Sequence, residues 1–173
     1  MKRRHLFAIA IFVLFASAAL AADMNPALQP LDFFAGKWRC TGTDSFMGPA
    51  HATVTNVNAR WGYAGHWMVV DVSQDKTKEN PGFMGTVYMG YDEGQKKLVN
   101  NWVDNMGGYA TAASDGWMGD TITYTGPQHM GAMVMNVRDV FTKQGTDKLT
   151  HKMLVEENGS WKQVVDESCM KKK

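Results

Sequence analysis

Short runs of β-forming residues, separated by turn residues every few positions, dominate this sequence from Lys37 onward. Regular short strands are typical of a sandwich or a barrel, and no segment offers the crossover helix that a parallel sheet needs. The sheet is therefore expected to be antiparallel. The ten candidate strands are Trp38–Phe46, His51–Arg60, Tyr63–Ser73, Gly85–Tyr91, Leu98–Asp104, Gly108–Ala113, Thr121–Thr125, Met133–Thr142, Leu149–Glu156 and Trp161–Met170.

A meander of about ten strands closes readily on itself, and closure removes the exposed edges of the sheet. The segment Pro26–Ala35 is the exception to the β pattern, because Leu28, Leu31 and Phe34 recur at helical spacing. One or two helical turns before the first strand are suited to capping a barrel end. The sequence thus predicts an all-β fold, a closed antiparallel up-and-down barrel with a short N-terminal helix capping one end.

The first residues have the layout of a secretory signal. Lys2, Arg3 and Arg4 precede an apolar run that is too short for a comfortable membrane span, and Ala19-Leu20-Ala21 supplies a small-x-small cleavage site. We expect residues 1–21 to be a signal peptide and residues 22–173 to form one domain. The mature protein would then be periplasmic or secreted, with no integral membrane span.

The charge balance and the absence of common catalytic and nucleotide-binding motifs argue against several classes of function. Without the three basic residues of the leader, 15 lysines and arginines stand against 17 acidic residues, and no basic stripe remains. Nucleic acid is therefore not an expected partner. The sequence also lacks the usual nucleophile, zinc-protease, phosphate-loop and dinucleotide motifs, so we lean against an enzyme.

Two cysteines remain after processing, Cys40 and Cys169. In a closed meander the first and last strands are neighbours, so a disulfide could join them in an oxidising compartment. Two free buried cysteines are the alternative.

A possible interior site comes from the expected pairing of the last strands. Asn158-Gly159 is the strongest hairpin signal, and a two-residue turn there places His151 opposite Asp166. The loop on the other side places Asp139 opposite His151. An imidazole between two carboxylates suits acid/base chemistry or a binding pocket, and the alternative is a polar cluster that only closes the barrel end.

That register has an internal conflict. It turns Cys169 outward, whereas Trp38 facing inward puts Cys40 inward too, and one bulge would repair the mismatch.

Apolar side chains on the predicted inward faces are candidates for lining a ligand cavity. These candidates are Trp38, Trp102, Met133, Met135, Phe141 and Met153.

The mature chain is rich in methionine, and His129, Met130 and Met133 form a His/Met cluster of the kind that binds copper(I). Ordinary core filling by methionine is the alternative. Alternation along the chain would also place Met130 on the face opposite Met133.

Several motifs in this order resemble a known family. Gly36-Lys37-Trp38 follows the predicted helix, and later come Gly65-His66-Trp67, Met89-Gly90-Tyr91-Asp92, Arg138-Asp139-Val140-Phe141 and Gly159-Ser160-Trp161. Together they resemble the bacterial domain of unknown function 1579. The resemblance implies a lipocalin-like barrel with an internal cavity and supplies no catalytic residues. The Gly-x-Trp piece and the late His151 also resemble nitrobindin-like haem barrels in part.

The leading functional hypothesis is a periplasmic barrel that binds a small apolar or amphipathic ligand in its interior, with no cofactor. The alternatives are a haem or copper barrel, an enzyme that uses Asp139, His151 and Asp166, and an envelope protein with a packed interior.

Overall fold

The computed structural model describes residues 25–78 and 82–173, so the predicted signal peptide lies outside the described residues. Two short 3-10 helices accompany the strands. The elements are η1 (Pro26–Phe34), β1 (Gly36–Asp44), β2 (His51–Gly62), η2 (Tyr63–Gly65), β3 (Trp67–Gln74), β4 (Met84–Asp92), β5 (Lys97–Asp104), β6 (Tyr109–Ser114), β7 (Trp117–Met118), β8 (Thr121–Met130), β9 (Met133–Lys143), β10 (Lys148–Glu157) and β11 (Ser160–Lys171).

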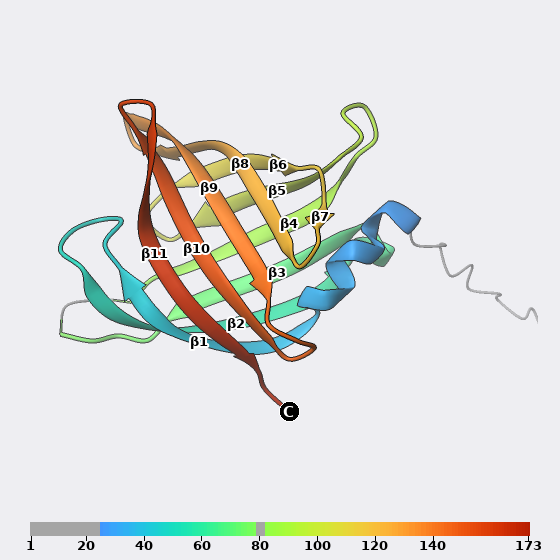
Figure 1. Ribbon diagram of the computed structural model, residues 1–173, viewed down its shortest axis with the longest axis horizontal. Helices are drawn as coiled ribbons and strands as arrows, with labels where there is room; N and C mark the ends of the chain where they lie inside the picture. The colour runs from blue at the N-terminus through green and yellow to red at the C-terminus, as the bar shows by residue number, and fades with distance from the viewer. Residues whose placement is uncertain (1–24, 79–81) are drawn as a thin grey trace, which may run out of the picture.

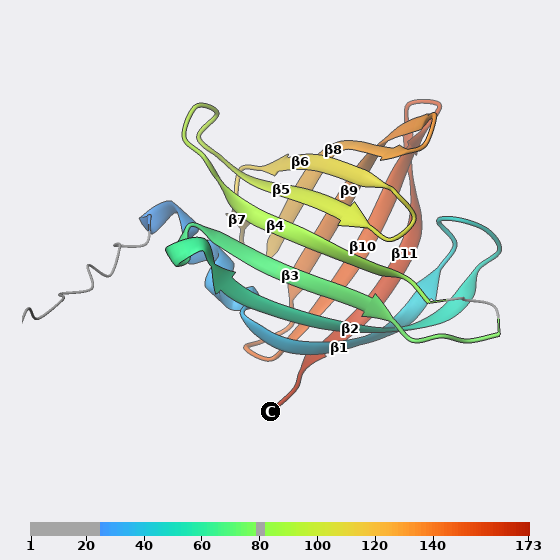
Figure 2. The same cartoon turned by 180° about the vertical axis from the view of Figure 1, so that it is seen from behind.

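The strands form a closed antiparallel barrel, as predicted. Consecutive strands pair from β1 to β6 and from β7 to β11, β1 pairs with β11, and β6 pairs with β8 to complete the ring (Figures 1 and 2). Among the described residues ten strands make up the wall, and the two-residue β7 adds only to the edge of β8.

The seam between β6 and β8 depends on a glycine. A Cβ atom at Gly126 would overlap the carbonyl oxygen of Thr111 on β6. The next residue, Pro127, has no N–H to donate, and the β6–β8 ladder has no paired residue at that position. Gly126-Pro127 looks like a strand break in the sequence, which is why the predicted strand stopped at Thr125 while β8 continues to Met130.

Helix η1 caps one end of the barrel, as expected (Figure 1). Its start is fixed by Asn25, whose side chain accepts a hydrogen bond from the backbone N–H of Ala27. Leu28, Leu31 and Phe34 are buried in the core. The indole N–H of Trp38 donates to the Phe34 carbonyl oxygen at 2.8 Å, which ties the helix to β1.

The predicted third strand began too early. Tyr63 and Ala64 have positive φ angles of 49° and 56° and form the turn η2, so β3 starts only at Trp67. A left-handed backbone at two successive non-glycine residues is rare, so no sequence pattern predicts this turn.

A disulfide joins Cys40 on β1 to Cys169 on β11, and the two Cα atoms are directly paired at 3.9 Å. This confirms the predicted bridge. The bond closes a separation of 129 residues, which corresponds to about 5 kcal/mol on the chain-entropy model. In the part of the chain that the structure describes, neither helix could span a membrane.

A β-bulge in β11 resolves the conflict in the predicted register. Met153 pairs with Val165 whereas Leu154 pairs with Gln163, so Val164 is an extra residue. Val164 and Val165 are both buried in a small apolar cluster. Beyond the bulge every side chain of β11 changes face, and this turns Cys169 inward toward Cys40.

Candidate functional site

The interior of the barrel holds a cluster of ionisable side chains centred on His151 of β10. Its Nε2 atom lies 3.0 Å from Oδ1 of Asp139 on β9, and its Nδ1 atom lies 3.4 Å from Oε2 of Glu167 on β11. The imidazole ring stacks on Phe141, with the ring centroids 4.6 Å apart. Phe141 in turn contacts Phe34 of η1, which places the cluster inside the barrel.

Glu167 is anchored by two threonines on β2. The hydroxyl groups of Thr55 and Thr53 donate to its Oε1 atom at 2.5 Å and 3.3 Å. Strand β1 lies between β2 and β11, and its residue Gly42 pairs with Thr53 on one side and with Glu167 on the other. Because Gly42 has no side chain, the carboxylate of Glu167 can reach across β1.

The surroundings of His151 hold it in the charged form. Burial opposes the charge, but the hydrogen bonds and charges of Asp139 and Glu167 outweigh burial and raise the pKa of His151 to about 9. For Glu167, burial alone would raise the pKa, yet the contacts with His151 and with both threonines hold the pKa of this carboxyl below its usual value. One imidazolium is therefore shared between two carboxylates.

Of the two carboxylates predicted to contact His151, one does so in the structure. The contact with Asp139 is confirmed, although Asp139 is the diagonal neighbour and Phe141 stands directly opposite His151. The predicted contact with Asp166 is wrong, because the bulge at Val164 moves Glu167 into that position. Asp166 instead pairs with Lys152 and accepts a hydrogen bond from the side chain of Gln163.

The six residues that were predicted to line a ligand cavity differ in their surroundings. Trp38 is buried in the core beneath η1, and Trp102 stacks on Phe83 while its indole N–H donates to Asp104. Phe141 packs against the main core, and Met135 and Met153 are partly buried against the small valine cluster. Met133 is about half exposed beside the β8–β9 turn and does not line the interior.

The predicted copper ligands do not come together on one face. Met130 and Met133 are cross-strand partners and share a face, contrary to the alternation argument. His129 precedes Met130 in the strand and therefore faces the other way, where its ring stacks on Tyr109.

The haem alternative does not fit the interior histidine. Both ring nitrogens of His151 lie against carboxylate oxygens, so neither is free to bind iron.

Two inward-facing side chains of this cluster keep part of their surface exposed. The side chains of His151 and Asp139 face inward, yet they remain 20% and 24% exposed. The partly exposed Met153 is the next inward residue of β10 after His151, toward the end that η1 does not cap.

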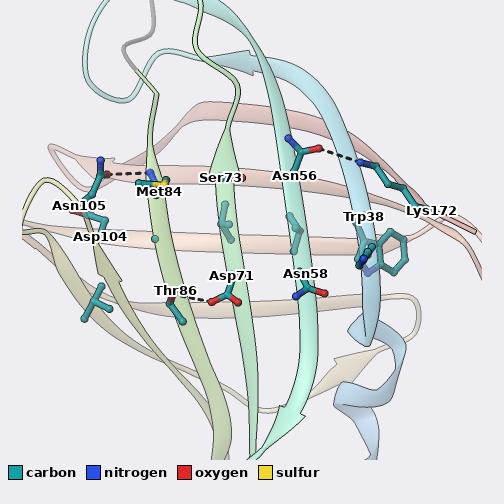
Figure 3. Close-up of a pocket in the computed structure, with 15 residues that line it drawn as sticks. Trp38, Asn56, Asn58, Asp71, Ser73, Met84, Thr86, Asp104, Asn105 and Lys172 are labelled. Carbon is teal, nitrogen blue, oxygen red and sulfur yellow. Dashed lines mark hydrogen bonds between the residues drawn. The ribbon is translucent and has the colours of Figure 1, made fainter.

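A hollow with a volume of about 560 Å³ lies on the outer face of β1 to β5, and we call it the outer groove. It lies between two rows of outward side chains that cross the strands (Figure 3). One row contains Lys37, Asn58, Asp71, Thr86 and Val103, and the other contains Asn56, Ser73, Met84 and Asn105. The backbone of the residues between the rows forms the floor.

Sequence reasoning missed this groove. Asn56, Asn58, Asp71 and Ser73 are visible as polar positions that alternate with valines. Only the cross-strand register aligns them into two rows.

Residues 25–171 match the family described as a protein of unknown function (DUF1579). Among solved structures, Rv2717c from M. tuberculosis is similar in fold, with a TM-score of 0.63, 10% sequence identity, and coverage of 87% of this chain and 100% of that chain. At this identity the likeness concerns the fold alone. The comparison with curated proteins finds no match.

Proposed function

We propose that this chain, which belongs to the DUF1579 family, is an exported barrel that binds one small amphipathic molecule in its interior. The observation that carries the proposal is the exposure of His151 and Asp139 on the inner wall. Ionisable groups that face inward and still contact solvent mark an interior that has room for a ligand. The disulfide between β1 and β11 is compatible with export.

The chemistry of the inner wall suits an amphipathic molecule. Asp139 uses one carboxylate oxygen for His151, and its other oxygen has no hydrogen-bond partner among the described residues. That oxygen can accept a hydrogen bond from the polar end of a ligand. Met135 and Met153 provide a flexible apolar wall for the rest of the molecule, since methionine adapts well to irregular shapes.

Binding fits this arrangement better than general-base catalysis. A general base must be unprotonated at working pH, whereas the pKa of His151 is raised to about 9. The imidazolium therefore orients Asp139 and Glu167 and balances part of their charge.

Titration of the purified mature protein with 1-octanol and with octylamine, followed by calorimetry, tests the proposal. We expect saturable binding of at least one probe with one site per chain. Met153→Trp should fill the interior space and abolish binding, while Met118→Trp, at a position that is 81% exposed on β7, should leave it unchanged. Absence of saturable binding for both probes, or binding that Met153→Trp does not weaken, would overturn the proposal.

A further inference from the structure

The outer groove is a second site, independent of the interior. We propose that it binds an acidic oligosaccharide, with a carboxylate of the sugar at Lys37 and Lys172 and the sugar hydroxyls along β2 to β5. The volume of about 560 Å³ lies within the usual range for small-molecule sites. Three properties of the groove lead to this ligand class: its charge, its free hydrogen-bonding groups and its fully paired floor.

Positive charge gathers at the β1 end of the groove. The backbone N–H of Lys172 donates to the carbonyl oxygen of Lys37 at 2.7 Å, which holds the two lysines side by side. Neither lysine has a carboxylate partner among the described residues, and the Lys172 ammonium donates only to Asn56 (Figure 3). Two unpaired ammonium groups at one end of a groove favour a ligand with a carboxylate at that end.

The arginines near the groove are already paired. Arg60 contacts Asp71, and Arg39 lies 3.4 Å from Asp75. No guanidinium is therefore left to form a bidentate fork around a phosphate. This charge pattern favours a carboxylate-bearing ligand over a nucleic acid.

Neutral polar groups continue along the groove from strand to strand. The side chains of Asn58 and Ser73 make no hydrogen bond within the described part of the chain, and Asn105 uses only its oxygen, to accept from the N–H of Met84. These groups come from β2, β3 and the turn after β5, with neighbouring strands about 4.8 Å apart. Amides and hydroxyls that both donate and accept match the hydroxyl groups of a sugar chain.

The rim of the groove supplies apolar contacts as well. Met84 and Val103 are 58% and 49% exposed at its β4–β5 end. Sugar rings carry C–H faces beside their hydroxyl edges, so both kinds of surface have a counterpart in the groove.

The floor of the groove excludes strand addition by a peptide. Strands β1, β2, β3 and β4 each pair with a neighbour on both sides. Their backbone N–H and C=O groups are therefore used within the barrel, and a peptide cannot join the sheet there by β-augmentation. Recognition in the groove depends on side chains.

Calorimetric titration of the mature protein with trigalacturonate tests the proposal, with maltotriose as the uncharged comparison and triglutamate as the acidic peptide. We expect trigalacturonate to bind more tightly than either. The double variant Lys37→Gln/Lys172→Gln should weaken its binding about tenfold, and Asn58→Ala should weaken it too. Lys152→Gln, an exposed change on β10, serves as the matched control and should have no effect.

Three results would overturn the proposal. They are no saturable binding of trigalacturonate, affinity that does not change in the double-lysine variant, and triglutamate binding as tight as the sugar. Failure of this test leaves interior binding of octanol or octylamine unaffected, because the two sites share no residue.

Discussion

We expect the charge on His151 to stabilise the folded barrel to an extent that depends on pH. In the unfolded chain its pKa is near the reference value of 6.5, and in the barrel it is raised to about 9. Because the folded value is the higher one, the stabilisation is complete below about pH 6.5 and is lost as the pH rises through about 9. The difference corresponds to about 3 kcal/mol of unfolding free energy.

Urea denaturation at about pH 6 and about pH 10 measures this contribution. The wild-type protein should lose about 3 kcal/mol more over this range than His151→Asn, whose side chain does not titrate. Lysines and tyrosines that titrate in the same range are common to both proteins and cancel in the comparison. His129→Asn, on the outer face, should behave like the wild type. Parallel pH profiles for wild type and His151→Asn would refute the assignment of His151 as a cation held by Asp139 and Glu167.

Three further changes test the register, the bridge and the close approach of β11 to β1. Glu167→Gln should lower the pKa of His151, as measured by NMR titration, whereas Asp166→Asn should leave it unchanged; the reverse would contradict the bulge. Reduction of the disulfide should lower the unfolding free energy by up to about 5 kcal/mol in denaturant titrations, and an unchanged midpoint would argue against the bridge. Gly42→Ala should cost about 1–3 kcal/mol, because a Cβ there overlaps the backbone of Asp166, while Gly48→Ala, where a Cβ meets nothing within 4 Å, should be neutral. Equal stability of the two alanine variants would count against that close approach.

Most strands could be predicted from the sequence, because each strand is short and bounded by turn residues. Asn158-Gly159 forms the expected hairpin turn, with φ angles of 51° and 75° that these two residues adopt easily. The two cysteines at opposite ends of the chain fit a closed meander, in which the first and last strands are neighbours.

The composition of the interior cluster was only partly predictable. The extra residue Val164 shifts the register of β11, so that Glu167 rather than Asp166 lies beside His151. A bulge of one residue in so short a strand leaves no periodic pattern that could be recognised in the sequence. Thr53 and Thr55, which anchor Glu167, lie two strands away on β2. Their contact with Glu167 depends on Gly42 of the intervening strand β1, which has no side chain. The outer groove depends on alignment across five strands, which is a property of the folded sheet.

Native mass spectrometry of the protein purified from the cells that make it tests directly whether the barrel holds a ligand. We predict a non-covalent adduct of one small molecule per chain in the wild type. The adduct should be absent from Met153→Trp and retained in Met118→Trp. An adduct that persists in Met153→Trp, or a wild-type protein that is always found at the mass of the bare chain, would contradict an interior binding site.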